Sequence, residues 1–142
     1  GEYKHTLDAK GRLTVPSRLR EEMVHGLVVA RGFDPCIVLY PVALWQEIGR
    51  RAALLPTTSS AARAFLRRFF SGGYEETLDR MGRVAIPATL RDYAGIDGDV
   101  IVAGANTYVE VWSPERWHQR RQQEEETLEE NLQELHDKGV QI

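Results

Sequence analysis

Hydrophobic and polar residues alternate near the start of the chain as they do in β-strands. The alternation predicts one strand over residues 3–7 and a second over residues 12–15. Residues 8–11 between them predict a tight turn, because Gly11 tolerates the positive φ that such a turn requires. The segment therefore has the pattern of a β-hairpin.

A short helix and two more strands are predicted to follow. Pro16 ends the second strand, and its fixed φ suits the start of a helix. Leu19 and Met23 have the i, i+4 spacing of one buried helical face, which predicts a helix over residues 17–24. Two runs rich in β-branched residues then predict strands over residues 27–30 and 36–40.

The first twenty residues recur 71 positions further along the chain. Ten of the 20 aligned columns between residues 1–20 and 72–91 are identical. Among the identical pairs are Asp8/Asp79, Gly11/Gly82, Arg12/Arg83, Pro16/Pro87, Leu19/Leu90 and Arg20/Arg91. With one inserted residue the match continues to Trp45/Trp117, so the chain is a tandem duplication.

The duplication divides the chain into four predicted parts. They are a first unit over residues 1–41, a helical hairpin linker over 42–71, a second unit over 72–113 and a C-terminal helix or tail over 114–142. In the linker, a serine or threonine between Pro56 and Ser60 can cap the second helix, and Ser113 with Pro114 predicts the start of the C-terminal helix.

A single unit of about 45 residues can barely bury a hydrophobic core. We therefore expect the two units to share one sheet and close into one β-barrel, flanked by helices. The predicted fold class is α+β. The single cysteine, Cys36, is expected to be a small buried side chain, because no second thiol is present to pair with it.

The 142 residues, 42% of them hydrophobic, predict a soluble globular protein. No apolar run approaches the ~20 residues of a membrane span, and residues 1–10 lack the apolar core of a signal peptide, so we expect a cytoplasmic protein without a membrane partner.

The charge is unevenly distributed along the chain. Residues 113–142 hold eight acids and four bases, which leaves the rest of the chain with 18 − 4 = 14 bases and 21 − 8 = 13 acids. Residues 1–20 carry five bases and two acids. Since phosphate binding needs a local basic surface and not a basic protein, the net charge of −3 does not exclude nucleic acid.

The repeated Asp-x-x-Gly-Arg motif is the candidate binding site. Arg12 and Arg83 are the predicted DNA contacts, because a guanidinium can hold a phosphate or read a guanine edge. Asp8 and Asp79 repel phosphate, so we assign them a structural role. Each is expected to orient its turn and the arginine four residues further on. A purely structural, salt-bridged turn is the alternative. Duplication of the whole motif, with its glycines Gly11 and Gly82, favours the functional interpretation.

Other bases near the motifs extend the predicted DNA-binding set. Lys10 and Arg80 lie within the turns, and Arg18 follows in the first predicted helix. The linker also carries five arginines against one glutamate, which we interpret as a solvated helical face in preference to a second DNA contact.

Residue types typical of catalysis are not grouped in this sequence. The four histidines do not occur at metal-ligand spacing with other ligands, and no phosphate-binding loop, dinucleotide motif or nucleophile elbow is present. We therefore expect neither an enzyme nor a metal, cofactor or small-molecule substrate.

In these motifs the chain resembles the MraZ family, bacterial regulators of the division and cell wall gene cluster built from two SpoVT-AbrB modules. The resemblance rests on residues 8–16, 34–41, 79–83 and 109–112. It implies a swapped-hairpin, double-psi-like β-barrel and assembly into a ring of several subunits.

The resemblance also implies a function. The family binds double-stranded DNA at short promoter repeats upstream of its own operon, which would place this chain at the nucleoid. Its Asp-x-x-x-Arg motifs fall on Asp8 with Arg12 and on Asp79 with Arg83. Met81 stands where the first copy has Lys10, so the second turn is expected to bind DNA more weakly or to face a neighbouring subunit. The alternative function is an oligomeric, antitoxin-like protein-interaction scaffold.

Overall fold

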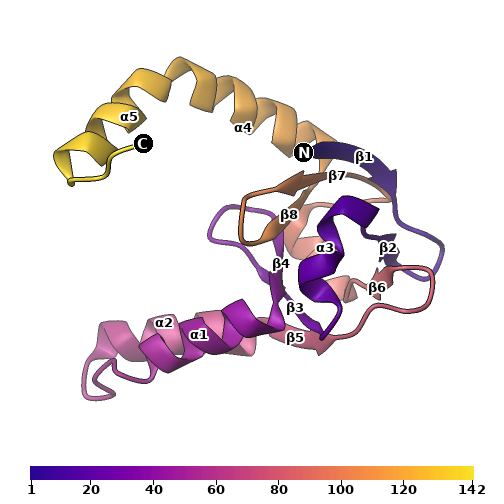
Figure 1. Cartoon of the computed structure of the whole chain (residues 1–142), viewed down its shortest axis with the longest axis horizontal. Coiled ribbons are helices and arrows are strands. Elements are labelled where there is room, and N and C mark those ends of the chain that lie inside the picture. Colours follow the sequence, from indigo (N-terminus) through magenta and orange to yellow (C-terminus); the bar gives the residue numbers. More distant parts are fainter.

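The computed structural model describes residues 1–142 and has an α+β fold (Figure 1). The elements of the first copy are β1 Glu2–Thr6, β2 Arg12–Thr14, the 3-10 turns η1 Ser17–Leu19 and η2 Glu21–Met23, β3 Leu27–Arg31 and β4 Ile37–Pro41. The linker forms α1 Val42–Ala52 and α2 Ser60–Ser71. The second copy contains β5 Gly73–Glu76, β6 Arg83–Ala85, α3 Ala88–Ala94, β7 Asp99–Gly104 and β8 Val109–Trp112, and is followed by α4 Pro114–Glu126 and α5 Leu128–Asp137.

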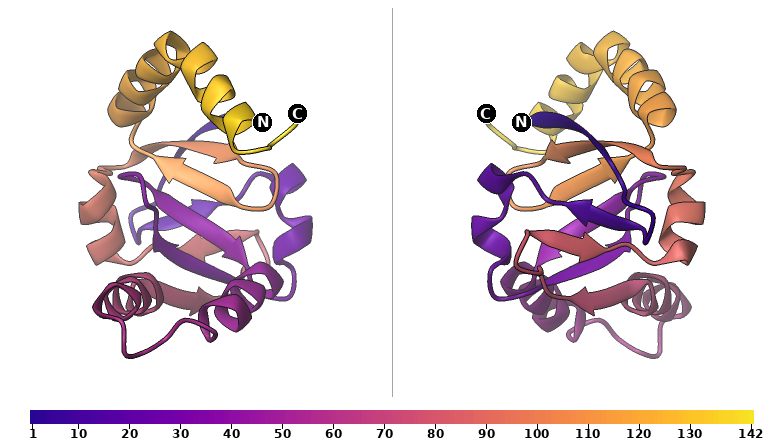
Figure 2. Two further views of the ribbon diagram at one scale, coloured as in Figure 1. Left: turned by 90° about the vertical axis from the view of Figure 1, so that its left-hand side faces the viewer. Right: turned by 90° about the vertical axis from the view of Figure 1, so that its right-hand side faces the viewer.

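Strands from the two copies alternate as neighbours, so neither copy forms a sheet of its own. Six strands form an antiparallel sheet in the order β1-β7-β8-β4-β3-β5, and β2 pairs with β6 in a separate two-stranded sheet. Every pairing except β3–β4 and β7–β8 therefore joins one copy to the other. Figure 2 shows the strands flanked by α3 on one side and by η1 and η2 on the other.

This arrangement corrects two expectations. Residues 3–7 and 12–15 were expected to form a paired hairpin, but β1 pairs with β7, and β2 pairs with β6. The expected barrel is not closed by strand pairing, because β1 and β5 remain as edges of the six-stranded sheet. Between β1 and β2 the chain turns so that each strand reaches a partner in the other copy.

The core follows the interleaved strands. A cluster of 17 buried residues includes Leu13 and Val84, which lie opposite each other in the β2–β6 pairing and are at most 1% exposed. A second cluster lies between the six-stranded sheet and the linker helices, where Trp45 stacks on Phe69 with 4.8 Å between ring centroids. Cys36 is fully buried in that cluster, as predicted.

The predicted helix over residues 17–24 is replaced by the two 3-10 turns, whereas the second copy forms the regular helix α3. Gly95 ends α3 with φ +66° in the left-handed region. The first copy has Val24 at the equivalent position, and a β-branched residue is strongly disfavoured there. The first copy therefore lacks this way of ending an α-helix.

The linker and the C-terminal segment form two helical arms. Ser59 caps α2 by accepting a hydrogen bond from the Ala62 amide at 3.2 Å, and Ser113 caps α4 by accepting one from Arg116 at 3.2 Å, as predicted. The predicted single C-terminal helix is interrupted at Thr127, where α4 ends. No helix in the structure has the length and apolar character needed to cross a membrane.

Candidate nucleic-acid interface

The turn at Asp8–Arg12, called here the first turn, is organised by the Asp8 carboxylate. One oxygen, Oδ1, accepts hydrogen bonds from the backbone amides of Lys10 and Arg12, both at 2.9 Å. The other, Oδ2, accepts one from the Nε of Arg12 at 2.7 Å. Gly11 has φ +74°, which explains the glycine at this position.

The turn at Asp79–Arg83, called the second turn, repeats this geometry. Asp79 Oδ1 accepts from the amides of Met81 and Arg83 at 2.9 Å, and Oδ2 accepts from Arg83 Nε at 2.8 Å. Gly82 has φ +75°. In both copies, the aspartate therefore contacts the backbone of its turn and the side chain of the arginine four residues further on.

Both aspartates are stabilised in their charged form. In each turn the largest cause is the hydrogen bond from the backbone amide of the arginine, which lowers the pKa of Asp8 and Asp79 below the ordinary value of 3.8. The hydrogen bonds from the arginine side chains act in the same direction. At neutral pH each turn therefore holds an ionised carboxylate against a guanidinium.

The β2–β6 pairing brings the two turns into contact. In its antiparallel register Arg12 lies opposite Ala85, and Thr14 lies opposite Arg83. As a result a terminal nitrogen of Arg83 lies 3.9 Å from Asp8 Oδ2, in addition to its own pair with Asp79. The side chains of Arg12 and Arg83 are 31% and 25% exposed, so both remain open to solvent while being held in place.

Two further arginines lie against the turns, and the sequence analysis did not select them. Arg20 donates from Nε to the Val15 carbonyl at 2.6 Å, and Arg91 donates to the Ile86 carbonyl at 3.1 Å.

Each of these guanidinium groups crosses to the glycine of the other copy's turn. A Cβ on Gly82 would overlap the guanidinium group of Arg20, and a Cβ on Gly11 would lie 3.0 Å from Arg91 Cζ. The identical Leu-Arg pairs in the aligned copies were the signal that could have identified them.

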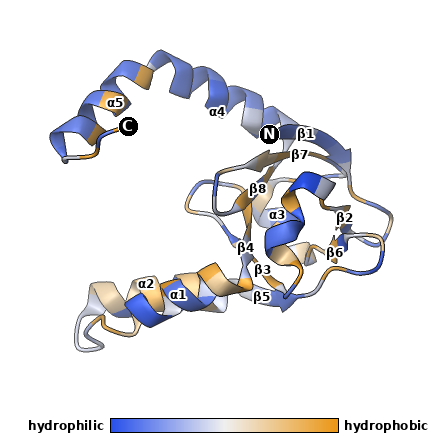
Figure 3. Cartoon of the chain, in the orientation of Figure 1, coloured by the Kyte–Doolittle hydropathy of each residue, from blue (hydrophilic) through white to orange (hydrophobic).

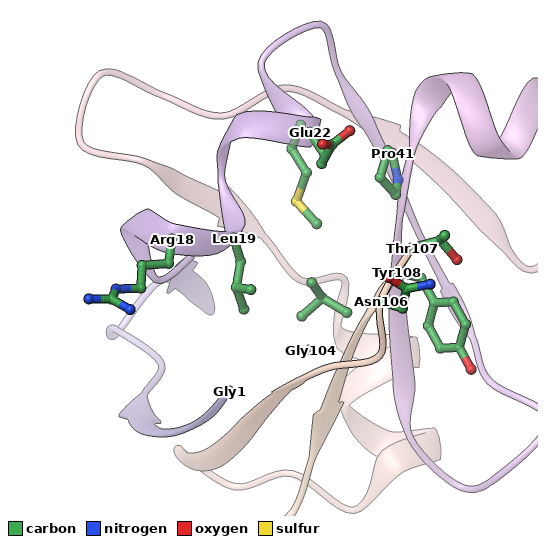
Figure 4. Close-up of a pocket in the computed structure, with 11 residues that line it drawn as sticks. Gly1, Arg18, Leu19, Glu22, Pro41, Gly104, Asn106, Thr107 and Tyr108 are labelled. Carbon is green, nitrogen blue, oxygen red and sulfur yellow. The ribbon is translucent and has the colours of Figure 1, made fainter. Parts of the chain in front are cut away.

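The remaining predicted contacts divide between two locations. Lys10 and Arg80 are exposed within the turns, next to the exposed Met81. Arg18 is placed elsewhere: it lines a pocket with Gly1 and Tyr108, at the end of β1 opposite to the first turn (Figure 4). We call the residues brought together by the two turns the turn cluster: Asp8, Lys10, Arg12, Arg20, Asp79, Arg80, Arg83 and Arg91.

The turn cluster holds six cationic side chains and two carboxylates, and both carboxylates are already engaged by hydrogen bonds. Such a surface can bind anions through exposed and partly exposed guanidinium groups. The structure brings together no group of three or more histidine, cysteine, aspartate or glutamate side chains that could hold a metal ion.

Comparison with known proteins finds the same family twice along the chain. The family model described as MraZ protein, with an antitoxin-like character, matches residues 1–68 and again residues 69–139. Among curated relatives, "Transcriptional regulator MraZ" of Syntrophomonas wolfei is 46% identical over 140 residues, covering 99% of this chain and 98% of the relative. The protein of that name from Moorella thermoacetica is 48% identical over 119 residues, covering 84% and 83%.

A less similar relative also matches over nearly the full length. "Transcriptional regulator MraZ" of Halothermothrix orenii is 39% identical over 140 residues, covering 99% of this chain and 98% of the relative. These relatives are named as regulators and not as enzymes. The family model and the relatives agree, and the chain belongs to the MraZ family.

Proposed function

We propose that this chain is a DNA-binding transcriptional regulator that contacts double-stranded DNA through the turn cluster. Two observations support this proposal. The relatives are named transcriptional regulators. The turns combine six cationic side chains with two carboxylates that are satisfied internally, which is the observation that carries the proposal.

The chemistry of the arginines suits this role. A guanidinium offers several N–H donors in one plane, and Arg12 and Arg83 each use Nε on an aspartate. Their terminal nitrogens are then directed by the aspartate and available for a phosphate or for the O6 and N7 atoms of guanine. Because the donors are held in place before binding, little side-chain entropy is lost when DNA arrives.

The symmetry of the two turns fits a duplex. The antiparallel β2–β6 pairing relates the first turn to the second by an approximate twofold rotation. The two backbones of B-DNA are related by a local twofold as well, so equivalent arginines can meet equivalent phosphates or base edges.

The proposal also includes the arrangement of the two units, the place where the regulator acts and its assembly. The two units adopt the swapped-hairpin arrangement of SpoVT-AbrB modules, with boundaries at residues 1–41 and 72–113. The regulator acts at the nucleoid, in the cytoplasm, on repeats upstream of its own division and cell wall operon. Copies assemble into a ring, so that linked turn clusters bind spaced repeats at a high effective concentration. Arg18 is a separate, peripheral contact.

The direct test measures binding of the full chain to a fluorescent fragment of that promoter region. Arg12→Ala is expected to weaken binding by ~1 to 3 kcal/mol, because a directed guanidinium contact is lost. Arg121→Ala, which removes an arginine from α4, is the matched control and is expected to bind as the wild type. Equal affinity of Arg12→Ala and wild type would refute the assignment.

A salt titration separates DNA binding from the alternative scaffold function. Contacts between several arginines and phosphates release counterions, so the logarithm of the affinity should fall linearly and steeply with the logarithm of the salt concentration. A mostly apolar protein interface would not show this dependence.

A further inference from the structure

Two helical segments carry opposite charge and are not used by the turn cluster. The acidic arm, residues 124–137 at the end of α4 and in α5, contains seven acids and no lysine or arginine. The basic arm, residues 42–71 with α1 and α2, contains five arginines and one glutamate. Glu47 is paired with Arg51 at 2.7 Å, so the other four arginines have no acidic partner on their own arm.

The acidic arm also carries apolar side chains that nothing in the chain covers. Leu128, Leu132 and Leu135 follow one another at i, i+4 and i+7, which places them on one face of α5. They are 46%, 49% and 38% exposed, and α5 has no buried residue. Figure 3 shows these apolar positions on an otherwise hydrophilic helix.

Exposed apolar residues also lie on the basic arm and beside it. Leu54, two residues beyond the end of α1, is 86% exposed, and Leu55 beside it is 38% exposed. Phe33, in the loop between β3 and β4, is 69% exposed and stacks on Phe65 of α2 with 6.3 Å between ring centroids. Both arms thus combine an uncovered apolar group with a surrounding charge, and the signs of these charges are opposite.

The arms point away from the turn cluster. In Figure 1 the acidic arm and the basic arm project from the same side of the strands, and the turns joining β1 to β2 and β5 to β6 lie on the other side. A duplex bound by the turns would therefore leave both arms uncovered. No ion pair links the two arms within the chain.

We propose that the acidic arm of one copy docks on the basic arm of a second copy. The apolar residues form the centre of the contact, and the charges form its rim and determine which surfaces meet. The contact joins two different surfaces, so each copy uses both arms and the assembly continues from copy to copy. This inference rests on the self-association proposed above and names the surfaces that produce it.

DNA is the competing occupant of the basic arm, and the apolar groups argue against it. A polyanion would satisfy the arginines and leave Leu54, Leu55 and Phe33 uncovered, and it would be repelled by the acidic arm. Each contact between copies covers one acidic arm and one basic arm together, because each arm supplies what the other lacks.

Two charge-reversed variants of the full chain test the proposal. In the first, Glu125→Arg, Glu126→Arg, Glu129→Arg and Glu130→Arg leave the acidic arm with four arginines against three acids. In the second, Arg50→Glu, Arg63→Glu and Arg67→Glu leave the basic arm with four glutamates against two arginines, at three exposed arginines without an ion pair. Each variant alone is expected to self-associate at least about tenfold more weakly than the wild type in sedimentation velocity, because like charges now meet.

An equimolar mixture of the two variants is the decisive measurement. The reversed arm of each variant is then opposite in charge to an arm of the other, so assembly is expected to return. A mixture that stays dissociated overturns the proposal, as does a variant that assembles alone as the wild type does. Circular dichroism of each variant checks that the helices are retained.

Two further variants control for apolar contact and for DNA. Leu132→Asp is expected to weaken self-association at least about tenfold, and Val24→Asp, which changes a residue 65% exposed on the body, is expected to have no effect. Arg12→Ala should assemble normally while losing DNA affinity, which separates failure of this proposal from failure of the DNA-binding proposal. If the variant with Arg50→Glu, Arg63→Glu and Arg67→Glu instead weakens binding to a duplex with a single repeat, the basic arm contacts DNA and the docking proposal is wrong.

Discussion

Asp8 and Asp79 each use one oxygen on backbone amides and the other on an arginine. At the scale of single residues, this explains why a surface proposed for DNA contains carboxylates: they hold the arginines that we propose make the contact. Their lowered pKa has a consequence for stability. A depressed folded-state pKa stabilises the fold above the ordinary value of 3.8 and ceases to do so as the pH falls through the folded value.

The pH dependence can be measured with Asp79→Asn. Its amide oxygen can still accept the backbone hydrogen bonds of the turn, but it has no charge to lose. Between about pH 5 and pH 2 the free energy of unfolding of the wild type is expected to fall more steeply than that of Asp79→Asn. Urea unfolding at each pH provides the measurement, with Asp97→Asn as the control. Parallel curves for wild type and Asp79→Asn would contradict the prediction.

Met81 tests the contribution of single charges to DNA binding. It is 64% exposed and stands where the first copy has Lys10. Met81→Lys is expected to strengthen binding to the promoter fragment and to steepen its logarithmic salt dependence by about one, because one more phosphate is neutralised. Val24→Lys adds the same charge to the body at another exposed apolar residue, and it is expected to leave the salt slope unchanged.

At the scale of elements, the two copies of one sequence motif are locked together by arginines crossing to the other copy's turn. Arg20, which follows η1, lies over Gly82, and Arg91 of α3 lies over Gly11. The glycines are therefore needed for two reasons, a positive φ and the space beneath a guanidinium. The two reasons can be separated experimentally.

Gly82→Ala is expected to lower the free energy of unfolding by about 1–2 kcal/mol and also to reduce DNA affinity, because the new Cβ displaces Arg20. Gly98→Ala is the matched variant: Gly98 has φ +91°, and a Cβ there meets nothing within 4 Å. It should lose stability but keep its DNA affinity. Thermal unfolding and promoter binding are measured for both variants. If Gly82→Ala binds the promoter fragment as tightly as Gly98→Ala does, the position of Arg20 does not depend on Gly82.

At the scale of the whole molecule, the interleaved strands make each copy dependent on the other. β1, β2 and β5 each pair only with a strand of the other copy. The isolated segment 1–71 would leave β1 and β2 without partners and would expose core residues such as Leu13.

The segment is therefore expected to be either unfolded or a dimer in which a second copy replaces the missing strands, never a folded monomer. Sedimentation equilibrium combined with circular dichroism distinguishes these states. A monomeric segment with a cooperative thermal transition would contradict the pairing described here.

Several features could be predicted from local sequence because they depend on nearby residues alone. The strand and helix positions were predicted within a few residues, as were the caps at Ser59 and Ser113 and the turns at Gly11 and Gly82. The repeat itself indicated Asp8 with Arg12 and Asp79 with Arg83, because each pair is only four residues apart. The loss of the first helix could not be predicted from Leu19 and Met23, since their spacing does not show how a helix ends.

What only the tertiary structure decided is which strands pair, and hence which distant residues meet. Any of the β-branched strands can hydrogen-bond to any other, so the alternation of residues does not specify a partner, and the expected local hairpin proved wrong. The selection of partners brought Arg20 and Arg91 onto the turns and left Arg18 apart from them. Sequence by itself determined the local geometry of each turn, because its hydrogen bonds span four residues. The composition of the turn cluster depended on packing between residues about 70 positions apart, for which no local signal exists.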